Sequence, residues 1–258
     1  MAGCAALLGD RVRHAIVPLC MGRKLLETTV SVAAFFAIWT VMRDGCFERA
    51  ENVDAIHAEN ALHARERAAA IPNDFVVPDS FPELLAALER LTGSAPVPFV
   101  GEHDWGAPVP SAGFAFRTRS DTLAEALADT LTRLVRPKGF HTFSYASGAG
   151  IGPSYVVAMP PADWYASIEL VATTGNPSPS SKEIVSWFRT LEREQPFTIT
   201  DIGRDHVGGR FLTALKDPRA LARRFNDFCP DIVTQGTRSV RNLEIELRES
   251  QYLYCWWD

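Results

Sequence analysis

Apolar residues recur at helical spacing in several stretches between residue 80 and the C-terminus. In residues 121–135 leucines lie three or four positions apart, which is typical of the buried face of a helix. Other such stretches begin with residues that cap helices, since their side chains accept a backbone hydrogen bond from the first turn. These predicted starts are Ser80 with Glu83, Ser180 with Glu183, and Asp217 before Pro218. A last helix is predicted over 237–249.

Other stretches alternate between apolar and polar residues, or are short and apolar, which is typical of strands. The six predicted strands are 113–117, 140–145, 155–159, 197–202, 210–215 and the final residues from 252. Residues 94–111 contain four prolines and two glycines and are predicted to be a loop. The sequence therefore predicts an α+β domain, with a mostly antiparallel sheet of about six strands flanked by helices.

The chain ends in an apolar segment, YLYCWWD. A terminus usually frays unless it is tied down, and this segment is too apolar to leave in water. We therefore expect it to be a buried or half-buried strand. Successive side chains of a strand point to opposite faces, so one of Trp256 and Trp257 would fill the core and the other would lie on the outer face.

The N-terminal region has a different pattern. Residues 1–46 are predicted to be an extension containing an apolar stretch, 25–42, and the uncharged part of that stretch is shorter than the roughly 20 residues of a spanning helix. Three explanations stay open: a signal-anchor with a cytoplasmic N-terminus, a helix buried against the domain, and an extension upstream of the true start codon. The localisation would be membrane-anchored in the first case, and cytoplasmic if no segment spans a membrane.

The following residues are rich in Ala, Glu and Arg, which favour helix. We predict a solvated helical linker over 47–71 and a domain over 72–258, because Pro72 and Asn73 break the helical pattern. The two histidines of this linker are six residues apart and do not share a helix face. They do not predict a metal site.

Composition and charge limit the classes of function. The 258 residues are 47% hydrophobic and 22% charged, as in an ordinary globular protein. The net charge of −5 argues against a nucleic-acid-binding surface, which requires a basic face. The glycine-rich residues 147–152 lack the spacing and the lysine of a phosphate-binding loop. We expect no cofactor and no metal.

None of the five cysteines forms a CxxC pair, so neither a zinc site nor a redox motif is predicted from spacing. Cys229 and Cys255 fall in the predicted domain. Two buried, reduced thiols are one interpretation, because free cysteine behaves as a small hydrophobic residue. A disulfide between them stays open if the domain is exported.

Cys229, Pro230 and Asp231 form a motif that has two interpretations. In an enzyme, Cys229 would be a nucleophile, His206 or His141 its base and Gln235 an oxyanion donor. However, Cys229 follows the end of a predicted helix, where the helix dipole disfavours a thiolate. In the structural interpretation, which we favour, Pro230 ends the helix and the Asp231 carboxylate caps a turn.

The other site candidates lie at the chain end. An exposed tryptophan is a good anchor for a protein partner. Asp258 carries two carboxylates that Arg or Lys could bind. We therefore predict Trp256, Trp257 and Asp258, together with Gln235, as binding residues.

The C-terminal motifs resemble a known family. The sequence FCPDIVxQG, a helix and the terminal LYxWWD are similar to the bacterial domain-of-unknown-function family four-two-five-three. The resemblance covers roughly 160–258, and 112–160 more loosely. It departs from the family pattern after Asn176, where this chain has PSPS. The family has no established activity, so the resemblance implies a fold boundary and no function.

Three functional hypotheses follow. We favour a non-enzymatic binding or interaction module, of the type that neutralises a toxin or senses a ligand. The second is a cysteine- or carboxylate-dependent enzyme that uses Cys229, Asp231 and His206. The third is an accessory protein tethered to a membrane through residues 25–42.

Overall fold

The computed structural model describes Ala58, Ala61 and residues 64–65, 69–103, 107–146, 153–175 and 179–257. The chain divides into two units, residues 1–54 and 55–258, and the first lies outside the described residues. The predicted N-terminal extension, the apolar stretch 25–42 and most of the predicted linker are therefore outside them. In the part that the structure describes, no helix is both long and apolar enough to cross a membrane.

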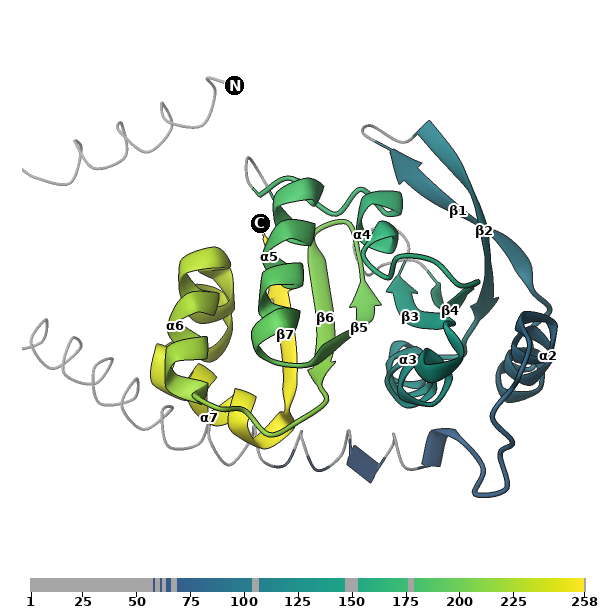
Figure 1. Cartoon of the computed structure of the whole chain (residues 1–258), viewed down its shortest axis with the longest axis horizontal. Coiled ribbons are helices and arrows are strands. Elements are labelled where there is room, and N and C mark those ends of the chain that lie inside the picture. The colour runs from purple at the N-terminus through teal and green to yellow at the C-terminus, as the bar shows by residue number, and fades with distance from the viewer. Residues whose placement is uncertain are drawn as a thin grey trace, which may run out of the picture. The chain divides into compact units, whose positions relative to one another are not determined.

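A seven-stranded sheet forms the centre of the domain (Figure 1). Its order is β1-β2-β4-β3-β5-β6-β7, and every neighbouring pair is antiparallel except β3 and β5. The strands are β1 (Val97–His103), β2 (Ala107–Arg117), β3 (His141–Ala146), β4 (Ser154–Met159), β5 (Phe197–Ile202), β6 (His206–Phe211) and β7 (Tyr252–Trp256). The predicted fold class, α+β with a mostly antiparallel sheet, is confirmed.

Helices pack on both sides of this sheet. They are α2 (Phe81–Thr92), α3 (Asp121–Val135), α4 (Ala166–Leu170), α5 (Ser181–Glu194), α6 (Pro218–Phe228) and α7 (Val240–Ser250), with a 3-10 turn η1 (Arg136–Lys138) and a π-helical turn η2 (Ile232–Thr237). Successive side chains of β4 point to opposite faces of the sheet, so this strand contributes to the core on each side. Val156 packs with leucines of α2 and α3, whereas Val157 belongs to the larger core that contains α4, α5, α6 and α7.

The number of strands differs from the prediction of about six. The seventh, β1, lies in the proline-rich stretch 94–111, which we predicted to be a loop. Proline lacks the N–H that a central strand needs, but an edge strand tolerates it. β1 is such an edge strand, and in β2 the prolines Pro108 and Pro110 lie outside the segment that pairs with β4.

The predicted helix starts are confirmed. The Ser80 and Ser180 side chains accept from the backbone N–H of Glu83 and Glu183, whose carboxylates accept in return, so both capping boxes form. Asp217 accepts from the backbone N–H of Ala220, with Pro218 as the first helical residue. These signals involve only neighbouring residues, which is why they can be recognised from the sequence.

The chain end is the strand β7, which forms the second edge of the sheet. It pairs antiparallel with β6, and His206 lies opposite Trp256. Beyond the strand, the Trp257 N–H donates to the Asp205 carbonyl at 2.8 Å. The predicted last helix begins later than expected, at Val240, because η2 extends to Thr237, Arg238 adopts a left-handed conformation, and Ser239 caps the helix.

Candidate functional site

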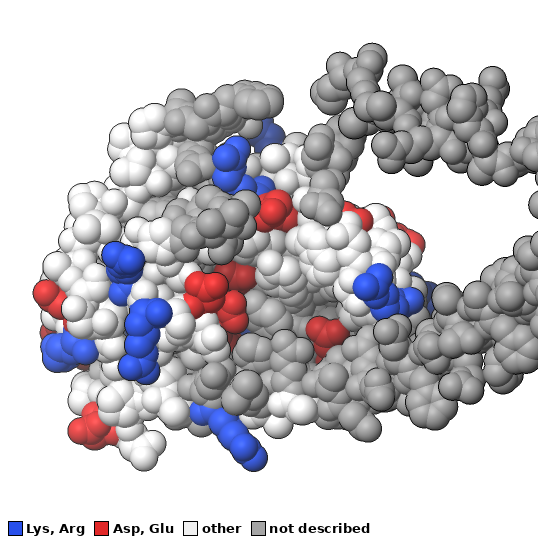
Figure 2. Space-filling view, turned by 180° about the vertical axis from the view of Figure 1, so that it is seen from behind, with Lys and Arg blue, Asp and Glu red and all other residues white. Residues whose placement is uncertain are grey.

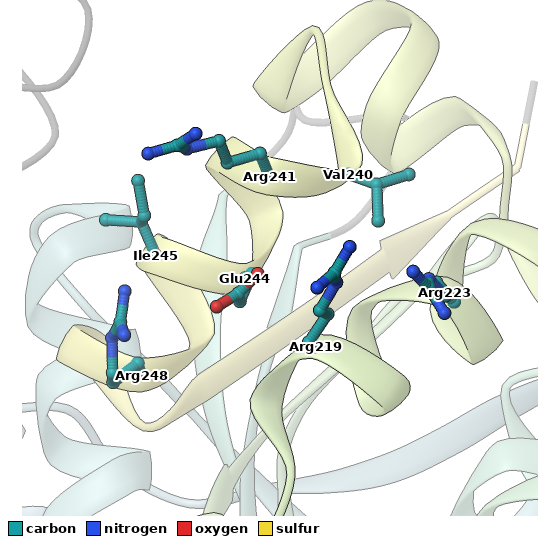
Figure 3. A pocket seen from close by; sticks show the side chains of 7 residues that line it. All are labelled: Arg219, Arg223, Val240, Arg241, Glu244, Ile245 and Arg248. Atoms are coloured by element: carbon teal, nitrogen blue, oxygen red, sulfur yellow. The ribbon is translucent and has the colours of Figure 1, made fainter.

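The candidate site is a groove between α6 and α7, lined by arginines from both helices (Figure 3). The two helices contact each other, and Leu221 and Phe225 of α6 lie buried in the same core as Leu243 and Leu247 of α7. On the side away from this core, four arginines line the groove. The lining residues are Arg219, Arg223, Val240, Arg241, Glu244, Ile245 and Arg248.

Helix periodicity explains why these residues meet. Arg219 and Arg223 are four residues apart on α6 and therefore lie one turn apart on the same face. Arg241 and Arg248 are seven residues apart on α7, which places them two turns, or roughly 10 Å, apart along the axis. In the view of Figure 3, Glu244 lies between Arg219 and Arg248. The groove therefore has positive charge on both helices and one carboxylate between.

Charges in the groove do not balance. Four guanidinium groups and one carboxylate leave an excess of three positive charges, in a chain whose net charge is −5. None of the four arginine side chains forms an ion pair with a described residue, and all four residues are exposed. On the face shown in Figure 2, Lys and Arg lie scattered among Asp and Glu over the described surface.

Two other arginines of this region have partners. Arg224, also on α6, forms an ion pair with Glu194 at the end of α5. Arg238, between η2 and α7, donates from Nη1 to the Thr234 carbonyl at 3.2 Å. The groove arginines are therefore distinguished from their neighbours by the lack of a partner among the described residues.

The groove has the size and chemistry of a site for a small anion. Its volume is about 530 Å³, within the range of small-molecule pockets. Val240 and Ile245 are half-buried and give it an apolar part. A guanidinium group binds carboxylate or phosphate oxygens through two parallel hydrogen bonds. Glu244 can accept a hydrogen bond from a hydroxyl or amine of the same ligand.

Cys229, the predicted nucleophile, lies at the end of α6 and is completely buried. Its Sγ donates to the Trp256 carbonyl at 2.8 Å. A hydrogen bond from the Cys255 thiol lowers the pKa of Cys229, although the helix end alone led us to expect the opposite. The lowered pKa of Cys229 could not be predicted from the sequence, because the second thiol comes from a distant strand.

His206, the first predicted base, lies on the other face of the sheet from Cys255, since its strand partner Trp256 neighbours Cys255 in β7. Its ring contacts Asp205 Oδ1 at 2.9 Å and Asp201 Oδ2 at 3.4 Å and stacks on Tyr254. Burial alone would lower its pKa, but the two carboxylates outweigh burial and raise the pKa of His206 to about 10. The imidazole is therefore protonated at neutral pH and is no general base.

His141, the alternative base, lies within the core. Its Nε2 is 3.1 Å from the Ile199 carbonyl and its Nδ1 is 3.4 Å from Ser167 Oγ. Burial lowers the pKa of His141 to about 4. The described contacts of Cys229 include neither histidine, so the structure does not bring the predicted cysteine–histidine pair together.

Asp231 and Gln235 lie beside η2. Asp231 precedes this turn and makes no side-chain cap hydrogen bond to η2; its carboxylate accepts from the Thr234 hydroxyl at 3.4 Å. The predicted capping of the turn by its carboxylate is thus wrong, because the chain enters a π-helical turn here. Gln235 is exposed. Neither residue lines the arginine groove.

The predicted binding residues at the chain end have different environments. Trp257 is buried, packs edge-on against Phe228 and donates from its indole N–H to the Phe228 carbonyl. Trp256 is half-buried and lies beside Tyr254. Asp258 is outside the described residues. A binding role for Trp256, Trp257, Asp258 and Gln235 stays a prediction.

The arginine groove was not predicted from the sequence. The signal was present as Arg219 with Arg223 and Arg241 with Arg248, each pair on the polar face of a predicted helix. A polar helix face is usually solvated, however, and periodicity within one helix does not tell which other helix lies beside it. Among the described residues, no group of three or more His, Cys, Asp and Glu is arranged to hold a metal ion.

One comparison with known proteins supports the predicted family, and the other two found no match. Residues 155–258 match the family model described as Domain of unknown function (DUF4253). The resemblance that we predicted over roughly 160–258 is confirmed, and residues 112–154 lie outside the match. The matched part contains both helices of the groove. No significant match to the chain was found among curated proteins or among solved structures.

Proposed function

We propose that the protein, in which residues 155–258 match a domain of unknown function, is a non-enzymatic binding module. Its α6–α7 groove binds a small molecule bearing phosphate groups. The observation that carries the proposal is the set of four arginine side chains without an ion-pair partner among the described residues. Like charges held close together repel, and a bound anion removes this repulsion.

The number of arginines favours phosphate over a single carboxylate. A phosphoryl group has three acceptor oxygens and up to two negative charges, so it can accept from arginines of both helices at once. A carboxylate has two oxygens and one charge, and a single guanidinium can bind both oxygens and balance that charge. A ligand with two phosphoryl groups would satisfy Arg219 and Arg223 as well as Arg241 or Arg248.

The residues of the groove support binding and no chemical step. Its seven lining residues include no serine, cysteine or histidine, so the one carboxylate, Glu244, has no nucleophilic side chain beside it to activate. The predicted Cys229 nucleophile is buried and separate from the groove-lining residues. A ligand in the groove would therefore be held and released unchanged.

Isothermal titration calorimetry with inorganic pyrophosphate tests the proposal. The full chain should bind pyrophosphate more tightly than inorganic phosphate, and added salt should weaken binding because exposed charges are screened. A hydrogen bond to a charged group contributes about 1.5–3 kcal/mol, so the double variant Arg219→Gln, Arg223→Gln should lower the affinity by at least about 100-fold.

Arg224→Gln is the matched control, because Arg224 lies on the same helix but is paired with Glu194. It should leave the pyrophosphate affinity unchanged. Equal affinity of the wild type, the double variant and this control, or no binding of either anion, would exclude the groove as a phosphate site.

A further inference from the structure

Two buried thiols lie in the core that the groove helices α6 and α7 also line. Cys229 caps the C-terminal end of α6 and Cys255 lies in β7, with η2 and α7 between them in the sequence. Both thiols are free and both side chains are completely buried in the same core. The domain therefore brings together two cysteines from distant parts of the chain.

The contacts of Cys229 place its thiol beside the chain segment that carries Cys255. Cys229 Sγ donates to the carbonyl of Trp256, the residue directly after Cys255, at 2.8 Å. The Cys255 thiol in turn hydrogen-bonds the Cys229 sulfur. We propose that Cys229 and Cys255 form a thiol–disulfide exchange site, at which a small-molecule disulfide closes a reversible bridge between α6 and β7.

The two thiols differ in a way that gives each a role. The hydrogen bond from Cys255 lowers the pKa of Cys229, whereas burial raises the pKa of Cys255. The thiolate is the attacking species in exchange, so Cys229 attacks first and Cys255 second.

The exchange is balanced in two steps. Cys229 loses its proton and attacks one sulfur of the small disulfide RSSR, which forms a mixed disulfide and releases one RSH. Cys255 then loses its proton and attacks Cys229 Sγ, which forms the protein disulfide and releases a second RSH. The two thiols are oxidised and one RSSR is reduced to two RSH.

Burial makes the exchange depend on a local opening. Cys229 is the last residue held by α6, through its N–H to the Phe225 carbonyl, and Pro230 and the π-helical turn η2 follow directly. Helix ends and irregular turns open at lower free energy than the core. We therefore expect exchange to be slower than at an exposed thiol.

The closed bridge would link the edge strand to the groove helices. It would close a loop that contains η2 and all of α7, and with α7 the arginines Arg241 and Arg248. A disulfide stabilises mainly by restricting the unfolded chain, and the effect increases with loop length. The oxidised protein should therefore melt at a higher temperature than the reduced protein.

The test uses the full chain with Cys4, Cys20 and Cys46 changed to Ser, so that only this pair remains. The protein is equilibrated with 2-hydroxyethyl disulfide and 2-mercaptoethanol at several ratios, alkylated after unfolding and analysed by peptide mass spectrometry. We expect one linked peptide pair that contains Cys229 and Cys255, with the loss of two hydrogens. The melting temperature should rise by about 5–10 °C and return on reduction.

Two results would overturn the proposal. One is a protein whose two thiols both remain alkylatable at equilibrium with a large excess of the disulfide. The other is a linked protein that melts at a lower temperature than the reduced form. The variant Cys255→Ala adds a check on the order of attack: it should retain a mixed disulfide at Cys229, and its absence would refute the assigned roles.

Discussion

Two charged pockets of this domain differ in how their charges are balanced. The groove between α6 and α7 has four arginines and one carboxylate, and none of the arginine side chains is ion-paired with a described residue. The pocket beside α5 has a similar volume, about 650 Å³, and is lined by three basic and two acidic side chains. There Arg189 pairs with Asp163, and Glu192 pairs with Arg136.

This difference separates charges that serve the fold from charges that are available to a ligand. Arg136 also donates to the Phe197 carbonyl, and Glu192 accepts from the Tyr165 hydroxyl, so the Arg136–Glu192 pair connects several elements. The groove arginines make no such connection among the described residues. Changes at paired charges should therefore alter stability, and changes at groove charges should alter binding.

The largest expected effect is a loss of stability at the most buried ion pair of the described residues. Arg210 of β6 contacts Asp129 of α3, Nε to Oδ1, at 2.6 Å, and their side chains are only 10% and 5% exposed. Removing one partner of a buried pair leaves an uncompensated charge and costs about 3–5 kcal/mol. Arg210→Met should lower the free energy of unfolding by this amount in urea denaturation.

The groove residue Arg248 supplies the matched control. Arg248→Met should leave the free energy of unfolding within roughly 0.5 kcal/mol of the wild type, as is usual for surface substitutions, and should weaken pyrophosphate binding. The opposite pattern, with the larger stability loss at Arg248, would break the distinction between the two kinds of charge.

A smaller effect is expected from pH at His206. Its folded pKa of about 10 lies above the ordinary value of 6.5, because Asp201 and Asp205 stabilise the imidazolium against the opposing effect of burial. A raised folded pKa gives stabilisation that is complete below pH 6.5 and is lost as the pH rises toward 10. The melting temperature of the wild type should therefore fall between pH 7 and pH 9.5.

His206→Gln should melt at a lower temperature at pH 7 and should show a flatter pH profile over this range. The range ends below pH 10 because tyrosines of the unfolded chain ionise there. Parallel profiles for the wild type and the variant would show that the two carboxylates do not stabilise the fold through this imidazole.

The smallest effect is expected at the single carboxylate of the groove. Glu244→Gln removes a negative charge that opposes an anionic ligand. Glu244 is half-buried at the surface, where one charge contributes about 1 kcal/mol, so the affinity for pyrophosphate should rise by roughly fivefold. Glu169→Gln, in the α5 pocket, should leave the affinity unchanged. A fall in affinity for Glu244→Gln would indicate that Glu244 accepts a hydrogen bond from the ligand.

Local features of this domain were predictable, whereas contacts between distant segments were not. The capping boxes at Ser80 and Ser180 and the buried end of the chain follow from residue types within a few positions of each other. The strand β1 was missed because tolerance of proline depends on a strand lying at the edge, and strand order is a property of the whole sheet.

The candidate site required the tertiary structure for the same reason. The sequence by itself determined that α6 and α7 each have one apolar and one arginine-bearing face, because helix periodicity acts over single turns. Only the packing of the two helices, with η2 between them, decided that those arginines share one groove and that Cys229 reaches Cys255. Both outcomes depend on the burial of a common apolar core, which no single segment can specify.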